Sequence, residues 1–141
     1  MPRFPLHAAS GTGVYTDWHK KVIRLARYGC ANRPFFHIVV MPVKLEQRKP
    51  PIEQLGTYDP SPNQFNEKLV ALNTERIMYW LGQGNVTISE PVEELLGLAG
   101  FLPIHPTTYI RAWRARRKTD EEAAKAKQEE EETRKAQEQS N

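Results

Sequence analysis

The alternation of apolar and polar positions predicts two β-strands joined as a hairpin. Residues 22–28 alternate, with Ile23 and Leu25 on one face and Arg24 on the other. Residues 35–41 are apolar on both faces apart from His37. Alternation with a period of two indicates a strand with one buried face, and a strand that is apolar on both sides belongs inside a sheet. We therefore expect the second strand to be central and buried.

Two shorter apolar runs, residues 52–58 and 68–72, predict two further strands. The segment 59–62 between them contains two prolines, each of which disfavours helix for the residue before it, so it is predicted to be a turn. No internal repeat is visible in the chain.

Two amphipathic helices are expected after the last strand. The first begins at Asn73 or Thr74 and the second at Ser89, residue types that cap helices, and Gly100 ends the second helix. Apolar residues at helical spacing form the buried stripes, Ile77, Trp80 and Leu81 in the first helix and Val92, Leu95, Leu96 and Ala99 in the second.

These elements predict an α+β fold, in which a small four- to five-stranded sheet packs with two amphipathic helices between N- and C-terminal tails. Residues 1–21 form an N-terminal extension with Gly and Pro but no periodicity. Residues 22–102 are the expected globular core. Residues 103–141 form a charged C-terminal extension that is partly helical, because Ala, Glu, Lys, Arg and Gln dominate it after two prolines.

Charge divides the 141-residue chain unequally. Residues 1–119 carry 16 Lys and Arg against 9 Asp and Glu, a net +7, whereas residues 120–141 carry a net −4. A basic body indicates a polyanionic partner, although a solvated basic surface is the simpler alternative. The single cysteine, Cys30, rules out an internal disulfide framework, and no apolar run is long enough to span a bilayer.

Candidate RNA-binding residues gather in the predicted hairpin and the loop after it. Arginine and lysine can neutralise phosphates, tyrosine can stack on bases, and asparagine can cap the turn or contact a ribose. The candidates of these types are Arg24, Arg27, Tyr28, Asn32, Arg33, Lys44, Arg48 and Lys49.

A second basic block lies in the C-terminal extension, near Tyr109, Ile110 and Trp113. Either the aromatic residues dock on a neighbouring protein while the arginines meet phosphate, or the segment is a surface helix with a small apolar seam. The RNA-binding candidates in this block are Arg111, Arg114, Arg116 and Arg117.

Catalytic patterns are weak, and we expect no enzyme. The segment Gly11–Gly13 is too short for a phosphate-binding loop and lacks a following lysine, and the four histidines are scattered without metal-ligand spacing. Two alternatives to a structural RNA-binding role remain open, a free-standing regulatory module that binds RNA or DNA and a nucleic-acid hydrolase.

Several short pieces of the chain follow one another in a recognisable order and spacing. They are Ile23–Arg27, Asn32–Phe36, Ile52–Pro60, Arg76–Ile77, Tyr79–Leu81, Gly84, Ser89, Val92 and Leu95–Leu96. Together they closely resemble the S-sixteen protein family of the bacterial-type small ribosomal subunit. The resemblance covers residues 22 to about 100 and implies an α+β fold that binds small-subunit ribosomal RNA and supports subunit assembly and translation, with Arg24, Arg27, Asn32 and Arg33 as RNA contacts.

The long tails and the Gly29–Cys30 turn resemble mitochondrial members of this family. This likeness implies a location in the mitochondrial matrix, with ribosomal RNA and other small-subunit proteins as partners and no small-molecule substrate. It also implies that Cys30 is one ligand of an iron–sulfur cluster or zinc shared with a neighbouring protein, because one cysteine cannot hold a metal alone. From the residues alone, an ordinary thiol in a turn is the alternative.

Overall fold

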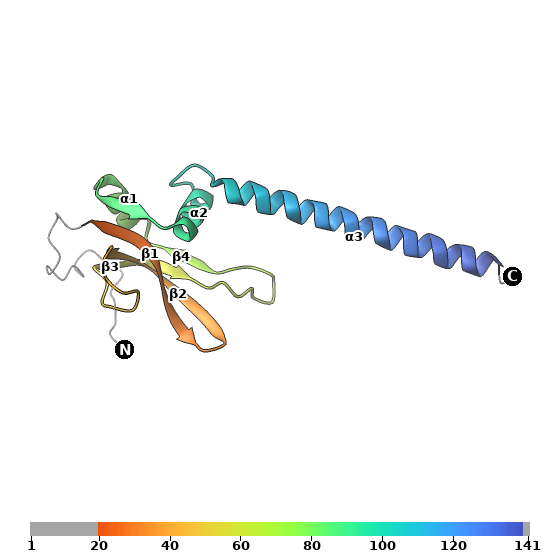
Figure 1. Ribbon diagram of the computed structural model, residues 1–141, viewed down its shortest axis with the longest axis horizontal. Coiled ribbons are helices and arrows are strands. Elements are labelled where there is room, and N and C mark those ends of the chain that lie inside the picture. Colours follow the sequence, from red (N-terminus) through yellow and green to blue (C-terminus); the bar gives the residue numbers. More distant parts are fainter. Residues whose placement is uncertain (1–19, 140–141) are drawn as a thin grey trace. The chain divides into compact units, whose positions relative to one another are not determined.

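The computed structural model describes residues 20–139, which fall into two compact units divided between Leu102 and Pro103 (Figure 1). The first unit contains a sheet and two helices, and the second contains one long helix. The expected N-terminal extension lies outside the described residues up to position 19, and Lys21 already begins the first strand.

The sheet has five strands in the order β4-β3-β2-β1-β5. β2 is central, as its two-sided apolar pattern predicts. The last strand pairs parallel with β1, and the other neighbours are antiparallel. This strand was not located from the sequence, because three residues are too few to show alternation. The strands are β1 (Lys21–Cys30), β2 (Arg33–Pro42), β3 (Glu53–Tyr58), β4 (Val70–Leu72) and β5 (Val86–Ile88).

Helices α1 (Thr74–Gly82) and α2 (Glu90–Ala99) lie on the same side of the sheet (Figure 1). The Asn73 side chain accepts a hydrogen bond from the Arg76 backbone N–H, so Asn73 is the N-cap of α1. Ser89 stands at the N-cap of α2 without a side-chain capping bond. Gly100 ends α2 in the left-handed conformation that glycine adopts without strain, as predicted.

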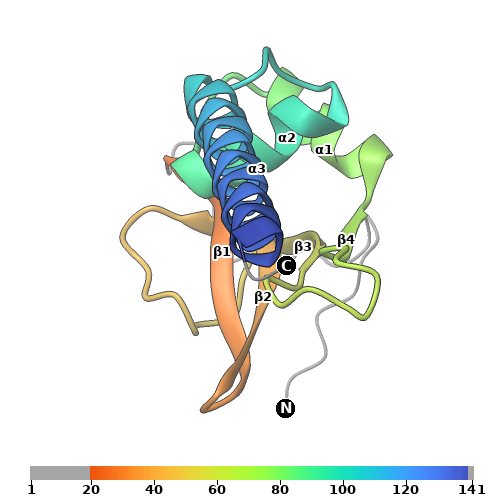
Figure 2. The same ribbon diagram turned by 90° about the vertical axis from the view of Figure 1, so that its right-hand side faces the viewer.

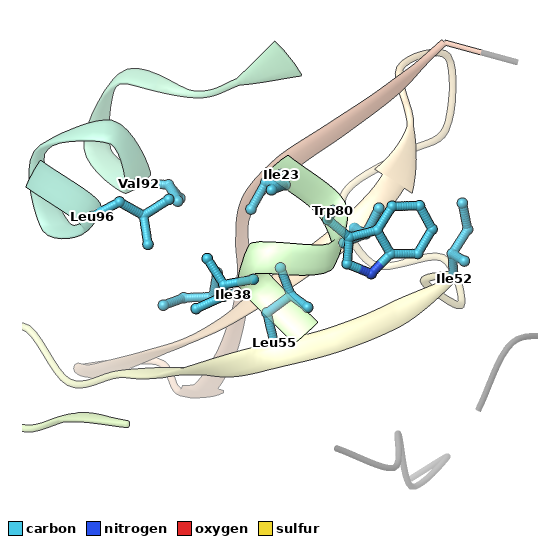
Figure 3. Packing of buried hydrophobic residues seen from close by; sticks show 9 residues of the cluster. Ile23, Ile38, Ile52, Leu55, Trp80, Val92 and Leu96 are labelled. Atoms are coloured by element: carbon cyan, nitrogen blue, oxygen red, sulfur yellow. The ribbon is translucent and has the colours of Figure 1, made fainter. Parts of the chain in front are cut away.

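The main core lies between this side of the sheet and the two helices (Figure 3). In α2 the predicted stripe was wrong at one position, since Ala99 is exposed and Gly97 is buried instead. Ala99 is the last residue of the helix, directly before the left-handed Gly100 where the chain leaves the helix. The buried residues of this core are Ile23, Ile38, Val40, Ile52, Leu55, Ile77, Trp80, Val92 and Leu96.

Strand alternation divides the hairpin between two faces of the sheet. The helix face carries the β1 and β2 residues that point to the same side as the main core, including Ile23, Leu25 and Arg27. The loop face is the opposite one. It holds a second small cluster of Ala26, Val39 and Met41, against which Tyr28 of β1 and Leu45 of the β2–β3 loop pack. The loop face comprises Arg24, Ala26, Tyr28 and Cys30 of β1 and Arg33, Phe35, His37, Val39 and Met41 of β2.

The second unit is built around helix α3 (Pro106–Gln139), a continuous helix of 34 residues. Its middle is stabilised by pairs at i and i+4, with Arg117 Nε 2.9 Å from Glu121 Oε1 and Lys118 Nζ 3.6 Å from Glu122 Oε1. The helix begins at Pro106, the second of the two prolines, and residues 103–105 before it form neither helix nor strand. No helix among residues 20–139 is both long and apolar enough to cross a membrane.

Candidate nucleic-acid interface

The hairpin turn places the start of β2 directly beside the end of β1. Gly29 has a φ of +103°, and a Cβ on it would lie 2.6 Å from the Arg33 carbonyl oxygen. Only glycine tolerates both conditions without displacement of the backbone. The turn therefore sets Cys30 opposite Arg33 in the register, both on the loop face, and leaves Asn32 exposed at the tip.

Arg24, one of the predicted RNA contacts, makes contacts within the chain. Its Nη2 donates to the Leu45 carbonyl oxygen in the β2–β3 loop and lies 3.6 Å from Met41 Sδ. Its Nε is buried and has no hydrogen-bond partner among residues 20–139. Most of the guanidinium is thus directed at the chain itself, so Arg24 connects β1 to the loop.

The β2–β3 loop (residues 43–52) lies beside β1 and is held in a defined shape (Figure 2). Gln47 Nε2 donates to the Leu25 carbonyl oxygen at 2.8 Å, and the Val43 N–H donates to the Lys20 carbonyl oxygen at 3.1 Å. Leu45 packs on the loop face. These contacts leave the three cationic candidates exposed at the margin of that face, namely Lys44, Arg48 and Lys49.

Three aromatic side chains lie next to one another on the loop face near the hairpin end. The Tyr28 and His37 rings are stacked, with centroids 4.3 Å apart and planes 28° apart, and Phe35 meets His37 edge-on at 5.7 Å. We call Tyr28, Phe35 and His37 the aromatic ladder. All three are half-buried, and the sequence analysis missed His37 because a lone strand histidine gives no signal of its neighbours.

The electrostatics of the ladder follow from its position. Burial raises the pKa of the Tyr28 hydroxyl, and the positive charge of Arg48 partly opposes this rise. Burial lowers the pKa of His37, whose Nδ1 is buried without a hydrogen-bond partner in the described part of the chain. The ladder is thus a set of uncharged rings with a cation nearby.

The predicted RNA-binding residues of the first unit separate into groups. Tyr28 and Arg33 lie on the loop face, where the Arg33 side chain is 77% exposed and reaches Asp59 only at 3.9 Å. Arg27 lies on the helix face, beyond the main core, and is exposed. The loop face, its flanking loop and the turn therefore gather most of the candidates, and Arg27 is the exception.

The candidates of the second unit all lie on the first half of α3. Arg111, Arg114, Arg116 and Arg117 are exposed, and the Arg117 guanidinium lies 5.8 Å from the centre of the Trp113 ring. Within this helix the apolar side chains Tyr109, Ile110 and Trp113 are also largely exposed.

Cys30 is exposed at the end of β1. A thiolate is the donor that iron–sulfur clusters and zinc prefer, so this position fits one ligand of such a group. The chain contains no second cysteine. The remaining ligands of a cluster would therefore come from another protein, and the cluster would lie between the two chains.

Comparisons with known proteins identify the family to which the chain belongs. The family described as ribosomal protein S16 matches residues 27–87. A Drosophila melanogaster protein named small ribosomal subunit protein bS16m is 57% identical over 119 residues, which is 84% of this chain and 92% of that protein. The bS16m protein of Schizosaccharomyces pombe is 39% identical over 61% of this chain and 96% of its own length. The bacterial protein bS16 of Acidiphilium cryptum is 39% identical over 58% of this chain and 71% of its own. The chain is a member of the ribosomal protein S16 family.

Proposed function

We propose that this protein is a structural component of the small subunit of the mitochondrial ribosome, where it binds small-subunit ribosomal RNA and supports subunit assembly. The observation that carries the proposal is the 57% identity to Drosophila bS16m across 92% of that protein. An identity of this size over nearly the whole relative includes the hairpin, the loop and both helices.

The geometry supports RNA binding through the loop face and its surroundings. Arg33, Lys44, Arg48 and Lys49 are exposed on segments that hydrogen bonds and the sheet hold in place. Cations on a rigid support neutralise converging phosphates without a large loss of chain entropy on binding. Arg24 contributes chiefly by holding the loop.

The S16 family is one of structural ribosomal components, which favours a non-catalytic role. We place the protein in the mitochondrial matrix, where a mitochondrial ribosome works. Its partners would be ribosomal RNA and other small-subunit proteins, and the exposed arginines and aromatic residues of α3 would meet such neighbours.

Sedimentation tests the proposal against the alternatives. Mitochondrial extracts are run through sucrose gradients at high salt, and the protein should migrate with the small subunit. A pool that stays at the top of the gradient would instead favour a regulatory module. Degradation of RNA or DNA by the purified chain with a divalent metal, lost on one acid-to-alanine substitution, would favour the hydrolase.

We further propose Cys30 as one ligand of an iron–sulfur cluster or zinc ion shared with a neighbouring protein. Its exposure at the hairpin end and its thiolate chemistry support this role. Cys30→Ser should remove iron or zinc from purified small subunits, as measured by elemental analysis. Unchanged metal content in assembled variant subunits would show that the thiol is not a ligand.

A further inference from the structure

The aromatic ladder is a half-buried set of rings on the loop face. This is the face of the sheet that α1 and α2 leave uncovered (Figures 1 and 2). Tyr28 and Phe35 are directly paired across the two strands, and the His37 ring contacts both of their rings. Such cross-strand pairs fix side chains at spacings set by the sheet. The rings therefore have little freedom left to lose when a ligand binds.

The ladder does not belong to the main core. That core lies on the helix face, whereas Tyr28 packs against the small cluster formed by Ala26, Val39 and Met41. On the helix face, Phe36 stacks on Tyr58 of β3 at 6.3 Å. The two faces of the hairpin therefore carry separate groups of rings.

The charges around the ladder suit a polyanion. Arg48 is close enough to Tyr28 to influence its hydroxyl electrostatically, and Arg33 lies on the same face with a largely exposed side chain. The acids in this neighbourhood are Asp59, 3.9 Å from Arg33, and Glu46, 3.9 Å from Lys49. Both contacts are long, so the cations remain available to phosphate.

We infer that the aromatic ladder binds an unpaired nucleobase of RNA, which stacks on Tyr28 while Arg33 and Arg48 hold the adjoining phosphates. Every base presents a π-face, so stacking on an aromatic side chain adds affinity with little sequence preference, and flanking cations follow the backbone. This inference rests on the proposed function. In addition to the proposed phosphate contacts, it assigns a contact with a base.

The test compares two single-stranded probes that have the same phosphates and differ only in their bases. One is a 12-nucleotide oligoadenylate, and the other is a 12-nucleotide RNA backbone that is abasic throughout. The full-length wild-type chain should bind the oligoadenylate about 10-fold more tightly, because base–aromatic stacking is the only difference. Equal affinity for the two probes would overturn the inference.

Three variants locate the preference. Tyr28→Leu should bind both probes with the affinity that wild type has for the abasic one, and Tyr28→Phe should keep the preference because the ring remains. Phe36→Leu, on the opposite face, should keep it as well. A preference that survives in Tyr28→Leu would place the stacking elsewhere and overturn the inference.

One measurement needs no variant that might fail to fold. With a single 2-aminopurine at the centre of an otherwise abasic probe, where no neighbouring base quenches it, stacking on Tyr28 should lower the fluorescence of the bound probe. Fluorescence that is unchanged on saturation would contradict stacking. The outcome is separate from that of the proposed function. A protein that sediments with small subunits but shows no base preference would lose only this inference, whereas a protein absent from subunits would lose the proposed function.

Discussion

The two faces of the β1–β2 hairpin are made by alternate residues of the same strands, yet they differ in chemistry. On the helix face, Ile23 and Ile38 are almost completely buried in the main core. On the loop face, the small cluster gives way to half-exposed rings and then to exposed cations. The comparison shows how a small domain separates its packed core from exposed charge, since neighbouring residues of one strand point to opposite faces.

A buried ion pair shows how strongly the helix face depends on internal contacts. Glu53 of β3 is 3% exposed and accepts hydrogen bonds from Arg76 Nε at 2.7 Å, Arg76 Nη2 at 2.9 Å and Trp80 Nε1 at 2.8 Å. The hydrogen bond to Glu53 is the main reason that the pKa of Arg76 is raised. These three hydrogen bonds join β3 to α1, so the cluster holds α1 on the sheet.

The largest effect should come from breaking that pair. Glu53→Ala leaves the Arg76 guanidinium and the Trp80 N–H without their acceptor, and we expect the free energy of unfolding to fall by about 3–5 kcal/mol. Urea denaturation measures this change in the free energy of unfolding. Glu121→Ala, which breaks the exposed pair with Arg117, should change it by less than about 0.5 kcal/mol. Equal effects of the two substitutions would contradict the assignment of stability to the helix face.

Substitution of Arg24 tests whether a side chain of the loop face also stabilises the fold. Arg24→Met keeps the packing of the side chain but removes the donor to the Leu45 carbonyl oxygen, and the expected loss is about 1.5–3 kcal/mol. Hydrogen exchange at the Val43 and Lys49 amides should accelerate, because the loop loses its anchor.

Arg24→Lys separates positioning from phosphate contact. If Arg24 chiefly positions the loop, the lysine variant should also exchange faster, because its single ammonium does not reproduce the guanidinium geometry. Slow exchange in both variants, with weakened RNA binding in Arg24→Met alone, would instead identify Arg24 as a direct phosphate contact.

The cations of the loop face and of the β2–β3 loop should set the salt dependence of RNA binding. Log affinity falls as log salt rises, and replacing Arg33 and Arg48 together by alanine should make this slope less negative by about 1.4–1.8, because each phosphate contact contributes about 0.7–0.9. Filter binding at several salt concentrations measures the slope. Removal of the same charge at Lys125 and Lys135 on α3 is the control and should leave the slope nearly unchanged; an equal drop there would mean that only net charge matters.

The smallest effect concerns pH and His37. Burial lowers the pKa of His37 below its usual 6.5, so below that pH the unfolded chain takes up a proton more readily than the folded one. The stability contributed by the neutral ring is therefore complete above about pH 6.5 and is lost as the pH falls toward the folded-state pKa. His37→Gln should show a shallower loss of stability between pH 7 and pH 5.5 in urea denaturation. An identical pH profile for the variant would assign the titration to another group.

The main elements of the fold could be predicted because their signals are local. The apolar run before Pro42 identified the central strand, Asn73 identified the start of α1, and Gly100 identified the end of α2. β5 could not be found, since its three residues form a strand only where the main chain of β1 offers partners.

The candidate interface was predicted in composition but not in arrangement. Arg33, Lys44, Arg48 and Lys49 lie exposed on or beside one face, as positively charged residues near a turn suggest. Arg27 falls on the other face, and the guanidinium of Arg24 is directed at Leu45. A sequence shows how many cations are near a turn but not which of them find an acceptor within the chain.

By itself the sequence determined most of the segments that become strands and helices, because period, capping residues and prolines act over a few neighbours. It also determined that the body of the chain is basic. Only the tertiary structure decided which side of the sheet the helices cover, that His37 contacts both Tyr28 and Phe35, and that Arg24 holds a loop. The reason is physical. These outcomes depend on contacts between residues far apart in the chain, whose geometry no local pattern records.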